Sequence, residues 1–227
     1  MKYVGMPMGM WVVFGKSFRK NLTTVFGVDE KTAKQVSAKA KVKYKEIIAR
    51  LTDFEKEDRF QMNLVNSAML SSFLLNLPKR PGVEKTTEYY KRAMMTKPME
   101  WFCRQSGKGK YSAKDIQAMK KTAELKAADR NPYSWNMDFY EYEDGSGYEA
   151  RFTKCGICVL MKELGLTELI PAMCRLDYTM SEAGGVTNFV REYTLASGGP
   201  YCDCGYKKKM REKSAHRLSW CPCCPGP

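Results

Sequence analysis

The side chains best suited to chemistry are concentrated between residues 151 and 206. Five of the nine cysteines of the chain lie in this stretch, at Cys155, Cys158, Cys174, Cys202 and Cys204. The single histidine, His216, falls near the C-terminus, so a Cys–His catalytic couple is not expected. The chemistry would instead rest on thiolates, carboxylates or a metal-bound water.

Cys155 and Cys158 form a C-x-x-C motif where a predicted strand passes into a predicted helix. A helix N-terminus lowers the pKa of a nearby thiol, which makes thiolate available near neutral pH. Three interpretations stay open: a redox pair, half of a metal site, or one functional cysteine with a buried companion. Redox motifs usually open a parallel β-α-β unit, and the hairpin predicted before Cys155 does not fit that pattern.

Cys202 and Cys204 lie two residues apart on a predicted strand, so both side chains share one face and Asp203 points to the other. Together with Cys155 and Cys158 they could complete a four-thiolate zinc site. The alternative is that they are small buried residues of the core. The sequence therefore requires no cofactor, and zinc is the one that its thiols could hold.

Cys174 and Asp177 lie three apart on a predicted helix, hence on the same side. A carboxylate at the edge of an apolar stripe is costly unless it has a partner, and Arg191 on the next predicted strand is a candidate. Either the two form an ordinary ion pair, or Asp177 acts as an acid–base group or substrate anchor. Arg191 could bind a ligand carboxylate through two parallel hydrogen bonds. Thr194 has the opposite parity on that strand, so both should not face one pocket.

Hydrophobic periodicity predicts helices over the first 130 residues. Their expected ranges are 9–26, 30–51 with Asp29 as N-cap, 58–77, 83–105 interrupted near Pro98, and 112–128. Residues 106–110 are expected to form a loop rich in glycine and lysine.

The periodicity then changes to alternation. Trp135, Met137 and Phe139, then Tyr148 and Phe152, alternate with other residues around a turn-rich segment and predict a β-hairpin. Helices over 156–164 and 167–183 and strands over 186–196 and 201–207 follow. The predicted fold is α+β, a single domain over residues 1–209. In it an N-terminal helical layer (1–130) packs on a C-terminal antiparallel sheet of about four strands (131–209).

Residues 210–227 are rich in cysteine and proline and are predicted to be a disordered tail. Their thiols at Cys221, Cys223 and Cys224 could bind soft metals, although an incidental tail is the simpler interpretation.

Composition limits the partners. The formal net charge is +13, yet the lysines are scattered and no nucleic-acid-binding signature accompanies them. The apolar stretch over 60–77 is interrupted by amide and hydroxyl side chains, which a bilayer would penalise. No convincing signal peptide is present, so the thiols are expected to be reduced in a cytoplasmic protein that binds neither nucleic acid nor membrane.

From Phe152 to Tyr206 the chain resembles the L-2-amino-thiazoline-4-carboxylic acid hydrolase family. The resemblance rests on an ordered set of motifs: Phe152-Thr153-Lys154-Cys155, Gly165-Leu166-Thr167-Glu168-Leu169, Cys174-x-x-Asp177-Tyr178, Arg191-x-x-Thr194-Leu195 and Gly198-x-x-x-Cys202-Asp203. The last two strands are also similar to the ligand-binding domain of 4-vinyl reductase proteins. The chain departs from the family pattern at Tyr201, where relatives tend to have histidine, and in its extra thiols Cys158 and Cys204.

The resemblance implies a hydrolase that opens a small cyclic amidine or thiazoline ring and gives a carbamoyl-cysteine. Cys155 or Cys202 would attack as thiolate, or would hold a metal whose bound water attacks, and Asp177 would move the proton. The substrate, a small molecule bearing a carboxylate, would be bound by Arg191, with Thr194, Cys174 and Asp203 in supporting positions. The alternatives are a non-catalytic small-molecule sensor and a thiol–metal protein.

Overall fold

The structure, a computed structural model, describes residues 1–55 and 58–209. It is α+β as predicted, with helices in the N-terminal part and a four-stranded antiparallel sheet in the C-terminal part. The predicted tail over residues 210–227, with its three cysteines, lies outside the described residues.

Four helices form the N-terminal layer: α1 (Met6–Phe26), α2 (Glu30–Arg50), α3 (Gln61–Leu74) and α4 (Val83–Met94). The Asp29 side chain accepts the Thr32 N–H and caps α2, as predicted, while Gly27 ends α1 in the left-handed conformation. Every residue of α3 from Leu64 to Leu74 is buried, including Asn66 and three serines, which explains why its sequence holds no charged residue on any side. None of the helices in the described ranges has the length and apolarity needed to cross a membrane.

The helix predicted over 83–105 is two helices, α4 and α5 (Lys97–Lys108). Thr96 caps α5, and Pro98 lies in its first turn, where a missing N–H costs no hydrogen bond. The loop predicted over 106–110 is shorter than expected, because α5 continues to Lys108. Helix α6 (Ala113–Ala127) follows after Tyr111, which has a positive φ of 66°.

The sheet has the order β1-β2-β4-β3. The predicted hairpin is present as β1 (Asp138–Glu141) and β2 (Gly147–Phe152), although Trp135 and Met137 are buried just before the first strand. β4 (Cys202–Lys208) pairs with β2 so that Cys202 lies opposite Phe152 and Cys204 opposite Ala150.

The strand predicted over 186–196 is wrong in its second half. β3 (Thr187–Val190) ends before Arg191, and Leu195–Ser197 form a short 3₁₀ helix, η2. Parity along a strand therefore does not govern Arg191 and Thr194, because neither residue lies in one.

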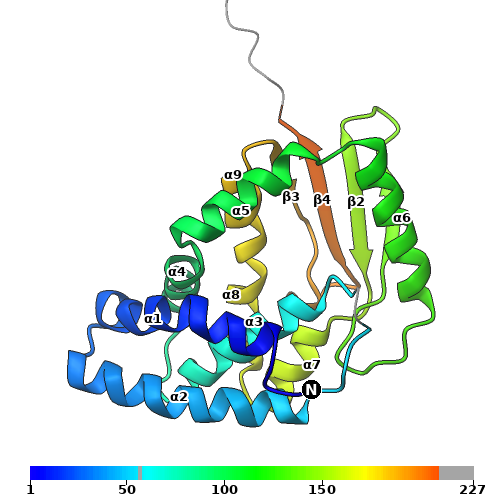
Figure 1. Ribbon diagram of the computed structural model, residues 1–227. Coiled ribbons are helices and arrows are strands. Elements are labelled where there is room, and N and C mark those ends of the chain that lie inside the picture. Colours follow the sequence, from blue (N-terminus) through cyan, green and yellow to red (C-terminus); the bar gives the residue numbers. More distant parts are fainter. Residues whose placement is uncertain (56–57, 210–227) are drawn as a thin grey trace, which may run out of the picture.

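The helix predicted over 167–183 is divided. After α7 (Gly156–Glu163) come η1 (Thr167–Leu169), α8 (Ile170–Cys174) and α9 (Leu176–Gly184). Pro171 lies in the first turn of α8. Cys174 therefore ends one helix and Asp177 lies in the first turn of the next, α9, which lies beside β3 (Figure 1).

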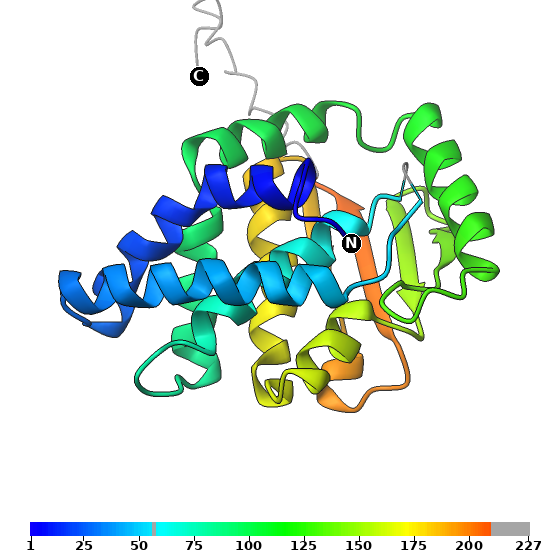
Figure 2. The same ribbon diagram turned by 60° about the horizontal axis from the view of Figure 1, so that its bottom comes forward.

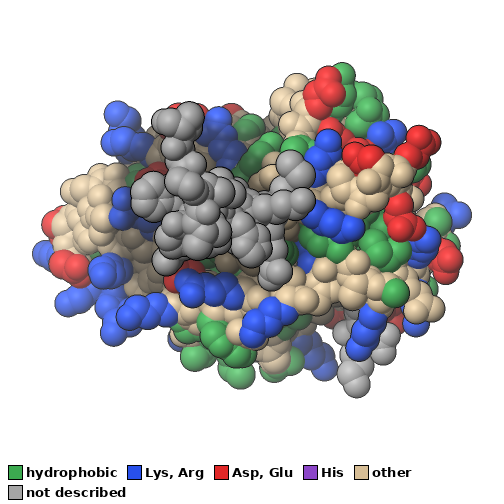
Figure 3. Space-filling view, turned by 90° about the horizontal axis from the view of Figure 1, so that it is seen from above, with side chains coloured by type: hydrophobic (Ala, Val, Ile, Leu, Met, Phe, Trp, Pro, Cys, Tyr) green, Lys and Arg blue, Asp and Glu red, His purple; other side chains and the backbone are tan. Residues whose placement is uncertain are grey.

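The two parts of the fold meet along the inner face of the sheet. Helix α5 packs on α9, α9 packs on β3, and α6 packs on β1 at the opposite edge (Figures 1 and 2). Helices therefore lie beside both edge strands of the sheet, α9 at β3 and α6 at β1. On the face seen in Figure 3, lysine and arginine side chains are spread out with acidic side chains among them.

Candidate active-site cavity

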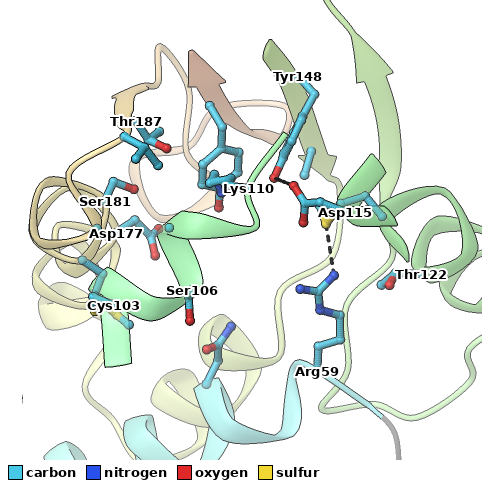
Figure 4. Close-up of a pocket in the computed structure, with 18 of the residues that line it drawn as sticks. Arg59, Cys103, Ser106, Lys110, Asp115, Thr122, Tyr148, Asp177, Ser181 and Thr187 are labelled. Carbon is cyan, nitrogen blue, oxygen red and sulfur yellow. Dashed lines mark hydrogen bonds between the residues drawn. The ribbon is translucent and has the colours of Figure 1, made fainter. Parts of the chain in front are cut away.

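A cavity of about 380 Å³ lies between the inner face of the sheet and helices α5, α6 and α9 (Figure 4). Aromatic and aliphatic side chains form much of its wall, including Phe60, Met137, Tyr148 and Tyr206. Its charged lining consists of Arg59, Lys110, Asp115 and Asp177. Two cations and two carboxylates therefore line one space that is large enough for a small polar molecule.

Lys110 is the least usual of these side chains. Its Nζ lies 3.8 Å from the centre of the Tyr206 ring and 5.3 Å from that of Tyr148. Burial lowers the pKa of Lys110 to about 8, Asp115 opposes this shift, and Arg59 adds to it. Among the described residues no carboxylate lies within ion-pair distance of this amino group, so an anionic ligand would find its charge uncompensated.

Asp115 is fixed at the α6 side of the cavity. Its Oδ2 accepts hydrogen bonds from the Tyr148 hydroxyl at 3.1 Å and from the Tyr111 N–H at 2.9 Å. The positive φ of Tyr111 aims that N–H back at the first turn of α6 and places Lys110 beside the cavity. Figure 4 shows Lys110 and Asp115 near one another at the wall formed by Tyr148.

Asp177 lies at the α9 side of the cavity, and 46% of its side chain is exposed, although it lies deep in the fold. Its Oδ2 accepts a hydrogen bond from Arg191 Nη2 at 2.6 Å. Burial raises the pKa of Asp177, and the charge and hydrogen bond of Arg191 oppose that shift. The exposed part of the Asp177 side chain faces the cavity. A partly desolvated carboxylate would therefore face any molecule bound there.

Arg191 is almost fully buried and is used inside the protein. Besides Asp177, its guanidinium donates to the Cys174 carbonyl at 3.1 Å and to Cys204 Sγ at 2.8 Å, and it stacks over Phe189. It does not line the cavity, whereas Asp177 does. The predicted Asp177–Arg191 pair is confirmed. The role of Arg191 in binding a substrate carboxylate stays a prediction.

Cys155 immediately precedes α7 as its N-cap residue, and Cys158 lies in the first turn. A hydrogen bond from the Cys158 thiol lowers the pKa of Cys155. Burial acts in the opposite direction and raises the pKa of Cys155. The N–H groups of Cys158 and Ile157 and the Trp135 side chain lower this pKa further. The same contact, together with burial, raises the pKa of Cys158. Of these two thiols, Cys155 is thus the one that ionises first.

Cys174, Cys202 and Cys204, the other cysteines between residues 151 and 206, are protonated thiols near neutral pH. Burial raises the pKa of Cys174 and of Cys204 to about 12, and it raises that of Cys202 as well. Cys202 Sγ accepts a hydrogen bond from the Leu195 N–H at 3.2 Å. These side chains and Cys155 lie close enough for their charges to act on one another, but none of the four lines the cavity.

Asp203 and Thr194 hold the segment that carries Arg191. The Asp203 carboxylate accepts the N–H groups of Glu192 at 2.8 Å and Tyr193 at 2.6 Å, and the Thr194 hydroxyl accepts the Ser197 N–H to cap η2. Asp203 lies opposite Arg151 in the β2–β4 pair, on the face away from Cys202. Their predicted part in substrate binding stays untested.

The four-thiolate metal site is not supported by this geometry. Within residues 1–55 and 58–209, no group of three or more His, Cys, Asp or Glu side chains is placed to hold a metal ion.

Sequence reasoning missed most of the cavity lining. It did not single out Arg59, Cys103, Lys110 or Asp115; the last three lie between residues 103 and 115, and Arg59 lies 44 residues before Cys103. Lys110 appeared only as a member of a predicted surface loop. The only local signal was the glycine-rich stretch that ends at Ser112, which caps α6 and so marks a tight connection between two helices.

The structure is an α+β protein with a cavity whose largely apolar wall carries two cations and two carboxylates. The family of L-2-amino-thiazoline-4-carboxylic acid hydrolases matches residues 62–206, and the chain therefore belongs to that family. No curated protein and no solved structure matches the chain significantly. The expected similarity to the 4-vinyl reductase domain receives no support from these comparisons and stays a prediction.

Proposed function

We propose that the protein is a hydrolase that opens a small cyclic amidine bearing a carboxylate, similar to 2-amino-thiazoline-4-carboxylate. The observation that carries this proposal is the cavity, in which Lys110 and Arg59 supply positive charge and Asp177 and Asp115 supply negative charge. Such a substrate has a carboxylate at one end and a basic amidine at the other. Its two charges therefore match the two kinds of side chain in the lining.

Lys110 is proposed to bind the substrate carboxylate. The Lys110 ammonium group lies against aromatic rings and has no carboxylate partner in the part of the chain that the structure describes, so it gains more from an incoming anion than a solvated lysine does. Arg191 is engaged by Asp177, Cys174 and Cys204, so it is better placed to orient Asp177 than to meet the substrate.

Asp177 is proposed to be the acid–base group. Its raised pKa makes it a stronger base than a solvated aspartate, and Arg191 holds one of its oxygens while the side chain faces the cavity. The carboxylate takes a proton from water as the water oxygen bonds to the ring carbon between nitrogen and sulfur. It then returns the proton to the ring atom that leaves, so that one water is added and a carbamoyl-cysteine is released.

The proposal is tested by comparing two substrates. Purified protein is incubated with 2-amino-thiazoline-4-carboxylate or with 2-amino-thiazoline, which lacks the carboxylate, and products heavier by one water are followed by mass spectrometry. We expect turnover of the first and a kcat/KM about 10–100-fold lower for the second, because a charge-assisted hydrogen bond contributes about 1.5–3 kcal/mol. Saturable binding without turnover would instead indicate a sensor.

A covalent route through Cys155 is the second candidate, and the lowered pKa of this thiol favours it. Cys155 does not line the cavity, so this route requires the reacting ring to reach the Cys155 thiolate outside it. The thiolate then attacks the same ring carbon, the ring opens, and water releases the product. Cys202, the other cysteine predicted to act as nucleophile, is a weaker candidate because its pKa is raised and it accepts the Leu195 N–H.

The two routes differ in what Cys155→Ser does. The covalent route predicts loss of turnover and an adduct on Cys155 in quenched wild-type samples. The direct route predicts that Cys155→Ser and Cys202→Ser both retain most of the wild-type kcat.

A further inference from the structure

The cavity is lined by two carboxylates, and only one of them is paired with a cation of the protein. Asp177 forms an ion pair with Arg191 at 2.6 Å. Asp115 has no lysine or arginine nitrogen within ion-pair distance in residues 1–55 and 58–209. A carboxylate at a largely apolar wall is costly without a cationic partner, so Asp115 is the carboxylate whose charge a cationic ligand would compensate.

The protein holds Asp115 through one of its two oxygens. Oδ2 accepts both the Tyr148 hydroxyl and the Tyr111 N–H, at 3.1 Å and 2.9 Å. Oδ1 accepts no hydrogen bond from any group in the described part of the chain. The N-cap of α6 is Ser112, whose Oγ accepts the Asp115 N–H, so the start of the helix does not need Oδ1. The direction of the carboxylate is therefore fixed while one oxygen stays available to a donor in the cavity (Figure 4).

We infer, on the basis of the proposed function, that Asp115 is the residue that makes this site specific for amidines. Its Oδ1 accepts a hydrogen bond from the amino group on the ring carbon that is attacked. The bond joins a carboxylate to a basic amidine, so it is charge-assisted and stronger than a neutral hydrogen bond. The negative charge of Asp115 also favours the protonated amidine, whose ring carbon is the better electrophile.

This assignment divides the work between the two carboxylates. Asp177 faces the cavity from α9 and Asp115 faces it from α6, so one can act on water while the other binds the amidine. Tyr148 is then a positioning residue, because its hydroxyl holds Oδ2 of Asp115. The ring of Tyr148 has a separate role, since its centre lies 5.3 Å from Lys110 Nζ.

Two stable analogues isolate the contribution of the amino group. 2-Amino-thiazole-4-carboxylate and 2-methyl-thiazole-4-carboxylate share the carboxylate and an aromatic ring that resists opening, and they differ only in an amino or a methyl group of similar size. Their affinities for the folded full-length chain are measured by isothermal titration calorimetry at pH 7. We expect the wild type to bind the amino analogue at least about tenfold more tightly, because the methyl group leaves the Asp115 carboxylate unpaired.

Asp115→Asn should abolish this preference without loosening the fold. The amide oxygen can still accept the hydrogen bonds of Tyr148 and Tyr111, which turns the amide NH₂ toward the amino group of the ligand, so that a donor meets a donor. We expect the two analogues to bind within about twofold of one another, and the methyl analogue to bind no more weakly than it does to wild type. Glu124→Gln is the matched control, because it removes the same charge from an exposed position of α6 outside the cavity and should keep the wild-type preference.

Tyr148→Phe tests the positioning role. It removes the hydroxyl that holds Asp115 and keeps the aromatic ring beside Lys110. We expect the preference for the amino analogue to fall between those of wild type and Asp115→Asn, while the affinity for the methyl analogue stays within about twofold of wild type.

Three results would overturn the inference: equal binding of the two analogues by wild type, an unchanged preference in Asp115→Asn, or equal weakening of both analogues in that variant, which would show a structural role. If Asp115→Asn does not fold, an unchanged preference in Tyr148→Phe overturns it instead. Neither analogue is turned over, so the preference can be present in a protein that does not open 2-amino-thiazoline-4-carboxylate. That combination would contradict the proposed hydrolysis and leave the assignment of Asp115 intact.

Discussion

Lys110 and Asp177 carry opposite charges at the wall of one cavity, but they do not pair with each other. Asp177 pairs with Arg191, whereas Lys110 has tyrosine rings around it. A partly buried ammonium group without a carboxylate partner costs stability, which is reflected in its lowered pKa. Such a cost is expected where a ligand supplies the missing charge.

Replacing Lys110 by methionine should therefore separate stability from binding. The side chain keeps its length and loses its charge, so we expect Lys110→Met to be more stable than wild type by about 1 kcal/mol at pH 7 and to bind the carboxylate substrate weakly. Chemical denaturation and KM measure the two effects. A variant that is less stable yet binds normally would show that Lys110 has a structural role.

The pH dependence follows from the same group. The pKa of Lys110 in the folded protein is about 8, below its ordinary value of 10.5. As pH rises, Lys110 therefore loses its charge in the folded state before it does so in the unfolded state. The stability advantage of Lys110→Met should shrink as pH rises through 8. In wild type, kcat/KM for the carboxylate substrate should fall over the same interval, and no such fall is expected with 2-amino-thiazoline.

At the scale of elements, close packing of α5 on α9 shapes the α9 side of the cavity. A Cβ at Gly107 would lie 2.5 Å from the carbonyl oxygen of Gly184, and both glycines line the cavity. The contact is between backbones, so neither side can move aside by a rotamer change. Gly9 offers a contrast, because a Cβ at this position in α1 would meet nothing within 4 Å.

Alanine at these two glycines should have opposite effects. Gly107→Ala should destabilise the protein by about 1–3 kcal/mol and lower kcat/KM, because α5 must shift away from α9. Gly9→Ala should stabilise it by up to about 1 kcal/mol, with activity unchanged, because alanine is the better helix former. Equal shifts in the midpoint of denaturation for the two variants would contradict the packing described here.

Local sequence signals predicted the elements that local chemistry determines. Asp29 as a cap, the turn between β1 and β2, and the apolar face of α1 lie within a few residues of what they control. The interruption near Pro98 was predicted from the proline and is present as the break between α4 and α5. The division between α8 and α9 was not predicted, because the hydrophobic stripe continues across it. The end of β3 was missed because the alternation over residues 186–196 gives no sign that the Asp203 carboxylate, from β4, accepts the Glu192 and Tyr193 N–H groups.

At the scale of the whole molecule, the cavity exists only after the two parts of the fold meet. Arg59 comes from the segment before α3, Lys110 from the connection after α5, and Tyr206 from the last strand. No motif links such positions, so Lys110 could not be predicted to be a binding residue. The predicted pairing of Asp177 with Arg191 succeeded because the two lie only fourteen residues apart.

The residues that line the cavity fall between Arg59 and Tyr206. A chain that ends at Lys209, where the backbone N–H bonds Val186 at the edge of the sheet, keeps all of them. Because all the lining residues are kept, we expect the truncated chain to retain kcat/KM within about twofold of wild type, which corresponds to about 0.4 kcal/mol. A large loss would show that the cysteines after Lys209 take part in turnover.

The most direct test of the proposed function is the turnover of 2-amino-thiazoline-4-carboxylate by Asp177→Asn. Asparagine keeps the shape of the side chain but cannot take a proton from water. The account predicts that kcat falls about 10²–10⁴-fold while KM changes little, because Lys110 still binds the carboxylate. Asp177→Asn that is folded and turns over at the wild-type rate would contradict the assignment of this cavity as the active site.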